Sequence, residues 1–113
     1  MSDSNEPLTW LNLPDVAEQI GVTVSRVRRL LEDRELLAVR RDGVLQVPSL
    51  FLRDGAPLKD LRGTVIVLAD AGFSDEDAMV WLLEEQDEIG DAPVNALRSG
   101  RKSEVRRVAQ ALA

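Results

Sequence analysis

The sequence contains no cysteine, no histidine and no tyrosine, and each absence removes a class of function. Without cysteine the chain forms neither a disulfide nor a thiolate metal site. Without histidine it lacks the most frequent general base and metal ligand, and the cysteine and tyrosine nucleophiles are absent as well. We therefore expect a protein that is not an enzyme and that uses no metal and no cofactor, although a Ser–Lys or two-carboxylate mechanism stays formally open.

Long apolar stretches are also missing, since no run approaches the roughly 18 residues of a membrane-spanning helix. The first residues, MSDSNEP, lack the basic and apolar regions of a signal peptide. We expect a cytoplasmic protein with no membrane partner, in which residues 1–8 form a disordered tail. With 113 residues, 44% of them hydrophobic and 30% charged, the chain has the composition of one small globular protein.

The net charge of −6 is spread unevenly along the chain. Residues 22–53 carry seven arginines and four acids, residues 70–91 carry nine acids and no base, and residues 98–107 carry five bases and one acid. An acidic total weakens long-range attraction to a polyanion, but phosphate contacts are local and are screened beyond about 10 Å. The two basic segments therefore keep nucleic acid open as a partner.

Two short helices joined by a tight turn are predicted at the start of the folded chain. Asn12 is a good N-cap for the first helix, and Gly21 is expected to end it. Thr23 is a good N-cap for a second helix at about 24–33. The apolar residues of the second helix form one buried stripe: Val27, Leu30 and Leu31.

The arginines of the second helix avoid this stripe. At about 100° per residue, Ser25 and Arg29 lie opposite it, and Arg26 and Arg28 lie on either side. The basic residues gather in the first two turns of the helix. This is where the recognition helix of a helix-turn-helix contacts base edges and phosphates.

The stretch RRDGVLQV predicts a β-hairpin after the second helix. Asp-Gly between two β-prone runs is typical of a type I′ turn, and it gives strands at about 37–41 and 44–48. Arg40 and Arg41 lie next to the turn. A ribbon in this place is the wing of a winged helix-turn-helix, which would lie along the DNA backbone or in the minor groove.

The rest of the chain predicts helices only. An apolar stripe begins near Leu58, Ser74 is an N-cap followed by acids, a short helix covers 93–98, and a last helix begins near Lys102. The expected fold class is mainly α with a small β-hairpin wing. A winged helix-turn-helix DNA-binding domain at 9–53 would be followed by a C-terminal helical region at 54–113 packed on it.

These elements predict double-stranded DNA as the partner, in the role of a transcriptional regulator or nucleoid-associated factor. Three helix arginines would enter or flank the major groove, two hydroxyls would hold the helix N-terminus on phosphate, and two hairpin arginines would make wing contacts. Because one short recognition helix buries little DNA surface, a homodimer is plausible. The predicted DNA-binding residues are Thr23, Ser25, Arg26, Arg28, Arg29, Arg40 and Arg41.

Each of these signals also has an alternative interpretation. The helix arginines would be ordinary surface charges if they paired with the acids that follow, Glu32, Asp33 and Glu35. Trp10 and Trp81 fit core packing better than base stacking. The acidic segment fits a solvated face better than a metal site, since no EF-hand pattern is present. The basic cluster at 98–107 is either a second phosphate-contacting patch or a surface that complements a helix dipole.

A protein–protein interaction module is the alternative function. The pattern WLLEEQ, APVNALRSG and EVRRVAQALA is similar to the toxin-binding helices of some antitoxins. In that case the C-terminal helices would bind a protein partner.

The stretch LPDVAEQIGVTVSRVRRLLEDRELLAVRRDGVLQVP resembles the compact winged helix-turn-helix of the MerR and excisionase type. The whole chain is similar to a family of small actinobacterial DNA-binding proteins, through LADAGFSDEDAMVWL, PVNALRSGR and EVRRVAQALA. This resemblance implies DNA binding by the winged domain and a regulatory or nucleoid role. The sequence has neither the long coiled coil nor the effector domain of MerR regulators, so their effector mechanism is not implied.

The same resemblance implies phosphorylation of the N-terminal segment by a Ser/Thr protein kinase, as in a mycobacterial member. Thr9 lies at the comparable edge of the fold and is the hypothetical phosphosite. A phosphate near the DNA-binding face would weaken DNA binding by repulsion.

Overall fold

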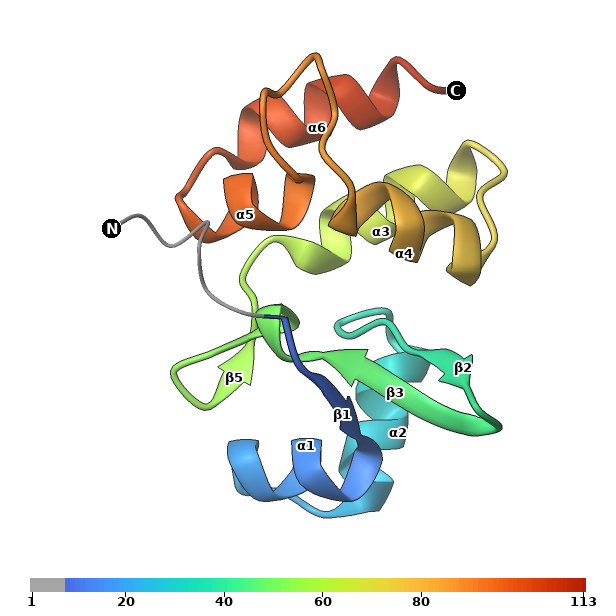
Figure 1. The fold of residues 1–113 in the computed structure, drawn as a ribbon, viewed down its shortest axis with the longest axis vertical. Helices are drawn as coiled ribbons and strands as arrows, with labels where there is room; N and C mark the ends of the chain where they lie inside the picture. Colours follow the sequence, from blue (N-terminus) through green and yellow to red (C-terminus); the bar gives the residue numbers. More distant parts are fainter. Residues whose placement is uncertain (1–7) are drawn as a thin grey trace.

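The computed structural model describes residues 8–113, and it confirms a mainly α-helical fold with a small antiparallel sheet (Figure 1). The tail predicted at 1–8 therefore falls, but for its last residue, outside the described residues. The elements in chain order are β1 (Trp10–Asn12), α1 (Leu13–Ile20), α2 (Val24–Glu32), β2 (Val39–Arg41), β3 (Val44–Pro48), the 3-10 turn η2 (Ser49–Phe51), β4 (Leu52–Arg53), β5 (Ala56–Pro57), α3 (Leu61–Asp70), α4 (Asp75–Leu83), α5 (Pro93–Arg98) and α6 (Lys102–Gln110).

The two predicted helices of the winged part form with the predicted caps. The side chain of Asn12 accepts a hydrogen bond from the backbone N of Asp15 (2.8 Å), and Gly21 ends α1 in the left-handed conformation with φ 71°. The hydroxyl of Thr23 accepts from the backbone N of Arg26 (3.1 Å) and so begins α2. The turn between the helices is therefore fixed by local hydrogen bonds at both sides.

The predicted hairpin also forms, with Asp42 (φ 54°) and Gly43 (φ 78°) in the positive-φ region that a type I′ turn needs. Its first strand begins at Val39 rather than at residue 37, because Leu36 and Leu37 are buried in the segment that leads into the sheet. A third strand, β1, was not predicted. It pairs antiparallel with β3, so the sheet has the order β1-β3-β2.

A second, shorter hairpin was also not predicted. It consists of β4 and β5 and turns at Asp54 and Gly55, with φ 53° and 75°. Both turns are formed by the same Arg-Asp-Gly sequence, at 41–43 and 53–55. The second hairpin lies near the C-terminal end of α1, because a side chain at Gly55 would contact the carbonyl oxygen of Gln19.

The C-terminal part consists of α3 to α6, as predicted, although α3 begins at Leu61 rather than near Leu58. Ser74 and Asp77 form a capping box at the start of α4. In Figure 1, α6 lies at the end of the molecule opposite α1 and α2, and α3, α4 and α5 lie between them. One cluster of buried residues runs through both parts, from Leu11 to Ala109, and it includes Trp81 as predicted.

Gly63 lies inside α3, where glycine costs about 0.5–1 kcal/mol relative to alanine. The three atoms nearest to a Cβ there all belong to the guanidinium of Arg106, the far end of a flexible side chain. We therefore expect Gly63→Ala to raise the free energy of unfolding by about 0.5–1 kcal/mol in urea denaturation. Gly43→Ala is the control and should lower it, because its φ is 78°. A less stable Gly63→Ala protein would contradict this reading of α3.

Candidate nucleic-acid interface

The outer face of α2 is an exposed basic surface. Val27 and Leu30 are buried against the rest of the winged part, whereas Ser25, Arg26, Arg28 and Arg29 are exposed. The predicted division of the helix into an apolar inner stripe and a basic outer face is therefore present in the structure. We call the three arginines at 26, 28 and 29 the α2 arginines.

The α2 arginines have no polar partner within residues 8–113. None of their guanidinium groups donates a hydrogen bond or lies within 4.0 Å of a carboxylate in the described chain, so the ion pairs with Glu32, Asp33 and Glu35 do not form. Other arginines are engaged: Arg62 donates to the carbonyl of Asp33 (2.9 Å), and Arg101 pairs with Glu104 (2.9 Å). The positive charge of α2 is thus directed to solvent.

The start of α2 offers hydroxyl groups as well. Thr23 is exposed, and its oxygen already accepts the capping hydrogen bond from Arg26. Its hydroxyl hydrogen remains able to donate outward, because a hydroxyl both accepts and donates. Ser25 is exposed in the first turn of the same helix. Donors at a helix N-terminus, where the helix dipole is positive, suit an anion such as phosphate.

The hairpin arginines are exposed but are held along the hairpin. Arg40 donates to the carbonyl of Gly43 (3.3 Å), and the guanidinium carbon of Arg41 lies 4.1 Å from the ring centroid of Trp10. Trp81 is buried in the core, and Trp10 is half-buried and packs against the core, as expected for both tryptophans. A cation–π contact of this kind contributes about 0.5–1 kcal/mol at an exposed site.

Trp10 is the site-forming residue that the sequence did not reveal. It contacts the hairpin because β1 pairs with β3, which places residues far apart in the sequence side by side. A hollow of about 350 Å³ opens beside it between the hairpin and α4, and Glu76 and Glu84 line this hollow together with Arg41. The wing arginines therefore face acids of α4 on one side.

Two family models match this chain, one in the winged part and one in the C-terminal part. The model described as "DNA-binding protein Rv2175c, wHTH domain" matches residues 3–52, and the model described as "Rv2175c C-terminal domain of unknown function" matches residues 58–113. The chain is 37% identical over 124 residues to the DNA-binding protein Rv2175c of Mycobacterium tuberculosis strain H37Rv, over 98% of this chain and 84% of the relative. The chain belongs to the Rv2175c family.

The solved NMR structure of Rv2175c has the same fold, with a TM-score of 0.83 and 35% identity over 98% of this chain and 84% of that one. The winged helix-turn-helix of the Rv2175c family therefore covers β1, α1, α2 and the β2–β3 hairpin here. The α2 arginines and both hairpin arginines lie within it. The second Rv2175c model covers α3 to α6, for which its description gives no function.

The basic cluster at 98–107 divides into two groups in the Rv2175c C-terminal domain. Arg98 is buried, and its Nη1 donates to the carbonyl oxygens of Leu50 (2.9 Å) and Leu52 (3.0 Å). Arg101 is held by Glu104 and by the carbonyl of Ile89. Both are thus engaged by atoms of the protein itself. The remaining bases of the cluster are exposed and make no such backbone contact: Lys102, Arg106 and Arg107.

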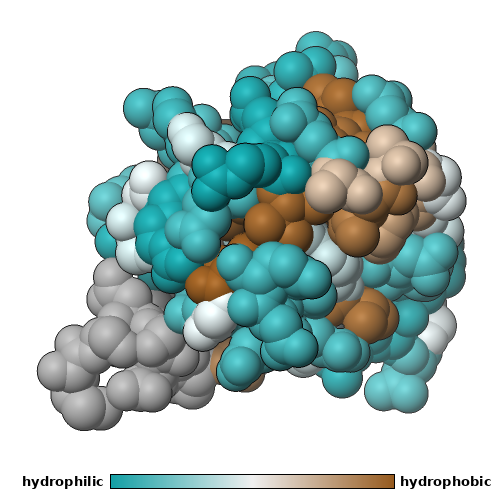
Figure 2. Space-filling view, turned by 90° about the horizontal axis from the view of Figure 1, so that it is seen from above, coloured by the Kyte–Doolittle hydropathy of each residue, from teal (hydrophilic) through white to brown (hydrophobic). Residues whose placement is uncertain are grey.

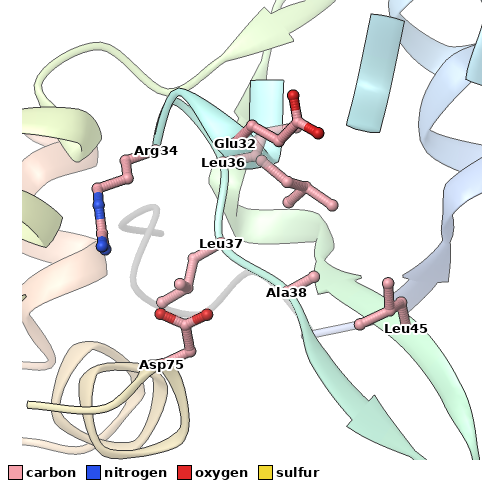
Figure 3. Close-up of a pocket in the computed structure, with 8 residues that line it drawn as sticks. Glu32, Arg34, Leu36, Leu37, Ala38, Leu45 and Asp75 are labelled. Carbon is pink, nitrogen blue, oxygen red and sulfur yellow. The ribbon is translucent and has the colours of Figure 1, made fainter. Parts of the chain in front are cut away.

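The cavity in Figure 3 lies where α2 meets the start of α4 in this Rv2175c relative. It measures about 280 Å³, and most of its lining is aliphatic, with Arg34 and Asp75 at one side. Within residues 8–113 no three acidic side chains gather in a way that would hold a metal ion. No helix in the same range is long and apolar enough to cross a membrane. The cavity therefore lies between the winged part and the C-terminal part.

Proposed function

We propose that this protein binds double-stranded DNA, with α2 in the major groove and the β2–β3 hairpin along the backbone. The observation that carries the proposal is the row of α2 arginines, exposed and without a polar partner in residues 8–113. Guanidinium groups match both phosphate oxygens and the acceptor edge of guanine. Membership of a family whose curated relative is named a DNA-binding protein supports it.

The contacts divide by their chemistry. Thr23 and Ser25 at the start of α2 hold phosphate, and the α2 arginines reach base edges or the phosphates that flank the groove. Arg40 and Arg41 contact the backbone from the hairpin after they leave Gly43 and Trp10, respectively. Because these hairpin contacts must first be given up, the hairpin contributes less than α2.

The binding test is fluorescence anisotropy of a labelled duplex of about 30 base pairs, titrated with protein at about 50 and about 200 mM salt. The logarithm of the association constant falls by about 0.9 per neutralised phosphate for each tenfold rise in salt. Several phosphate contacts therefore predict a loss of at least tenfold between the two conditions. No binding at low salt would overturn the proposed function.

The cellular role and the oligomeric state can be tested with the same DNA. A regulator must prefer particular sites, whereas a nucleoid-associated factor tolerates most sequences, and selection from a random duplex pool separates the two. A homodimer would supply two recognition helices to two half-sites about one DNA turn apart. An enriched palindrome in the selected pool would support the dimer.

Phosphorylation of Thr9 by a Ser/Thr protein kinase would act on this interface. Thr9 is exposed, its backbone N donates to the Ser49 hydroxyl (3.0 Å), and it directly precedes Trp10, which carries Arg41. A phosphate there adds negative charge beside a hairpin arginine and so opposes DNA binding. This proposal rests on the family resemblance and on the position of Thr9 in the fold.

The apolar residues of the antitoxin-like pattern pack inside this protein itself. Its apolar positions are buried in the core of the C-terminal part, among them Trp81, Leu97, Val105 and Ala109. Residues that already pack inside the protein offer no open face to a partner. The structure therefore favours DNA over a protein partner of that type.

A further inference from the structure

The C-terminal domain carries a second exposed basic surface that the winged helix does not include. Two adjoining hollows, of about 550 and 270 Å³, share Asp60 and Lys102 in their linings. Lys59 lines the first, and Arg106 and Arg107 line the second. We call these two hollows the basic groove. It runs from the β4–β5 hairpin and the loop before α3 to α6, and α6 lies at the end of the molecule that Figure 2 views from above.

The charge of the groove contrasts with that of the whole chain. In a protein of net charge −6, its exposed bases include Lys59, Lys102, Arg106 and Arg107. Arg53, also exposed in the first hollow, donates to the carbonyl oxygen of Arg98. The facing acid Asp60 lies 3.8 Å from Lys102, and its side chain is 25% exposed, so it neutralises one base in part. Asp54 lines the far end of the first hollow, on the β4–β5 turn. Positive charge remains in excess along α6.

A structural role accounts for few of these bases. The helix dipole favours cations at the C-terminal end of a helix, which accounts for Arg107 in the last turn of α6 but not for Lys102, its first residue. Arg106 and Arg107 make no hydrogen bond or ion pair within residues 8–113. The buried arginine of this region, Arg98, by contrast donates from Nη1 to two backbone carbonyl oxygens. The exposed bases are therefore available to an anionic partner.

The groove is connected to the recognition helix by neighbouring residues. Arg62, near the start of α3, donates to the carbonyl oxygen of Asp33 at the end of α2. The next residue, Gly63, lies against the guanidinium of Arg106, because a Cβ atom added at Gly63 would contact that guanidinium. Arg62 and Gly63 thus connect the C-terminal end of α2, at Asp33, to Arg106 on α6. The whole molecule measures only 36 Å in its longest direction, about ten base pairs of duplex.

We propose that the basic groove binds the phosphate backbone of the same DNA duplex, beside the segment held by α2. This assigns a DNA-clamping role to the C-terminal domain, and it rests on the proposed function. The occupant is a DNA strand because charge complementarity and continuity with α2 both point to it. The groove contributes affinity and no sequence preference, since phosphate contacts carry no base information.

The first test compares charge-removing and charge-keeping variants on the duplex of about 30 base pairs. Arg106→Gln combined with Arg107→Gln should weaken binding about five- to tenfold and lower the magnitude of the salt slope by about 2. Arg106→Lys combined with Arg107→Lys keeps the charge and should retain the wild-type slope. Thermal denaturation of both variants checks that the fold is intact. A wild-type slope for the glutamine variant would overturn the proposal.

The second test uses the absence of cysteine in the chain. Ser103→Cys places one thiol on the exposed face of α6 between Lys102 and Arg106, for a photocrosslinker. It should cross-link to duplex at trace DNA concentration, where no protein molecule holds two duplexes. Glu85→Cys, on the exposed acidic loop after α4, is the control and should not. Cross-linking of Ser103→Cys only in DNA excess would mean a second duplex and would overturn the same-duplex proposal.

A parallel titration separates this proposal from the proposed function. If neutralising Arg28 and Arg29 leaves binding unchanged while the α6 variant loses it, the recognition-helix proposal fails and the groove remains a DNA-binding site. If the α2 variant loses binding and the α6 variant does not, only the groove proposal fails.

Discussion

Replacing Arg28 and Arg29 together by glutamine is expected to weaken binding of a duplex of about 30 base pairs by tenfold or more. Both side chains are exposed on the outer face of α2 and have no polar partner in residues 8–113, so the change breaks no contact of the folded protein. Removing a phosphate contact lowers the salt slope by about 1, and removing a base contact costs about 1–3 kcal/mol. The measurement is anisotropy at several salt concentrations.

The matched control replaces the same two arginines by lysine. Lysine keeps the charge but lacks the planar fork that binds the guanine edge at two points. If the pair contacts only phosphates, the lysine variant should bind as the wild type does. If Arg29 reads a base, the lysine variant should keep the salt slope and lose the preference for selected sites. Wild-type affinity for the glutamine variant would show that α2 is not the DNA-binding face.

The features of α2 that matter for this prediction could be foreseen because their causes are local. Thr23 caps a backbone N only three residues away, and Val27 and Leu30 are one turn apart on the buried stripe. The hairpin turn likewise depends on two adjacent residues, Asp42 and Gly43, with positive φ. A short window of sequence contains all of these interactions, so it suffices to place the helix, its basic face and the hairpin.

The features that could not be foreseen depend on distant residues. Strand β1 exists only because Leu11 pairs with Val47, and this pairing brings Trp10 to the hairpin arginines. The same holds for Arg98, whose hydrogen-bond partners lie 48 and 46 residues away. The sequence alone therefore does not separate Arg98 from the other bases of the cluster at 98–107. The β4–β5 hairpin has a local turn signal, but its strands of two residues are too short to show an alternating pattern.

The burial of Arg98 leads to the largest expected effect on stability. Its Nη1 donates to the carbonyl oxygens of Leu50 and Leu52, and Arg53 donates in turn to the carbonyl of Arg98. These bonds join α5 to the segment that follows the hairpin, and so they hold the C-terminal domain on the winged one. Because these hydrogen bonds lie in the protein interior, water does not readily replace them, and their loss costs free energy.

We expect Arg98→Met to lower the free energy of unfolding by about 3 kcal/mol. Methionine replaces the aliphatic part of arginine but has no guanidinium, so two carbonyls lose their charged partner, and hydrogen bonds to a charged group contribute about 1.5–3 kcal/mol each. For a chain of this size the melting temperature should fall by roughly 10 °C or more. The control is Arg107→Met, an exposed arginine on α6, which should change stability by about 0.5 kcal/mol or less. Equal stabilities of the two variants in urea denaturation would mean that Arg98 does not hold the two parts together.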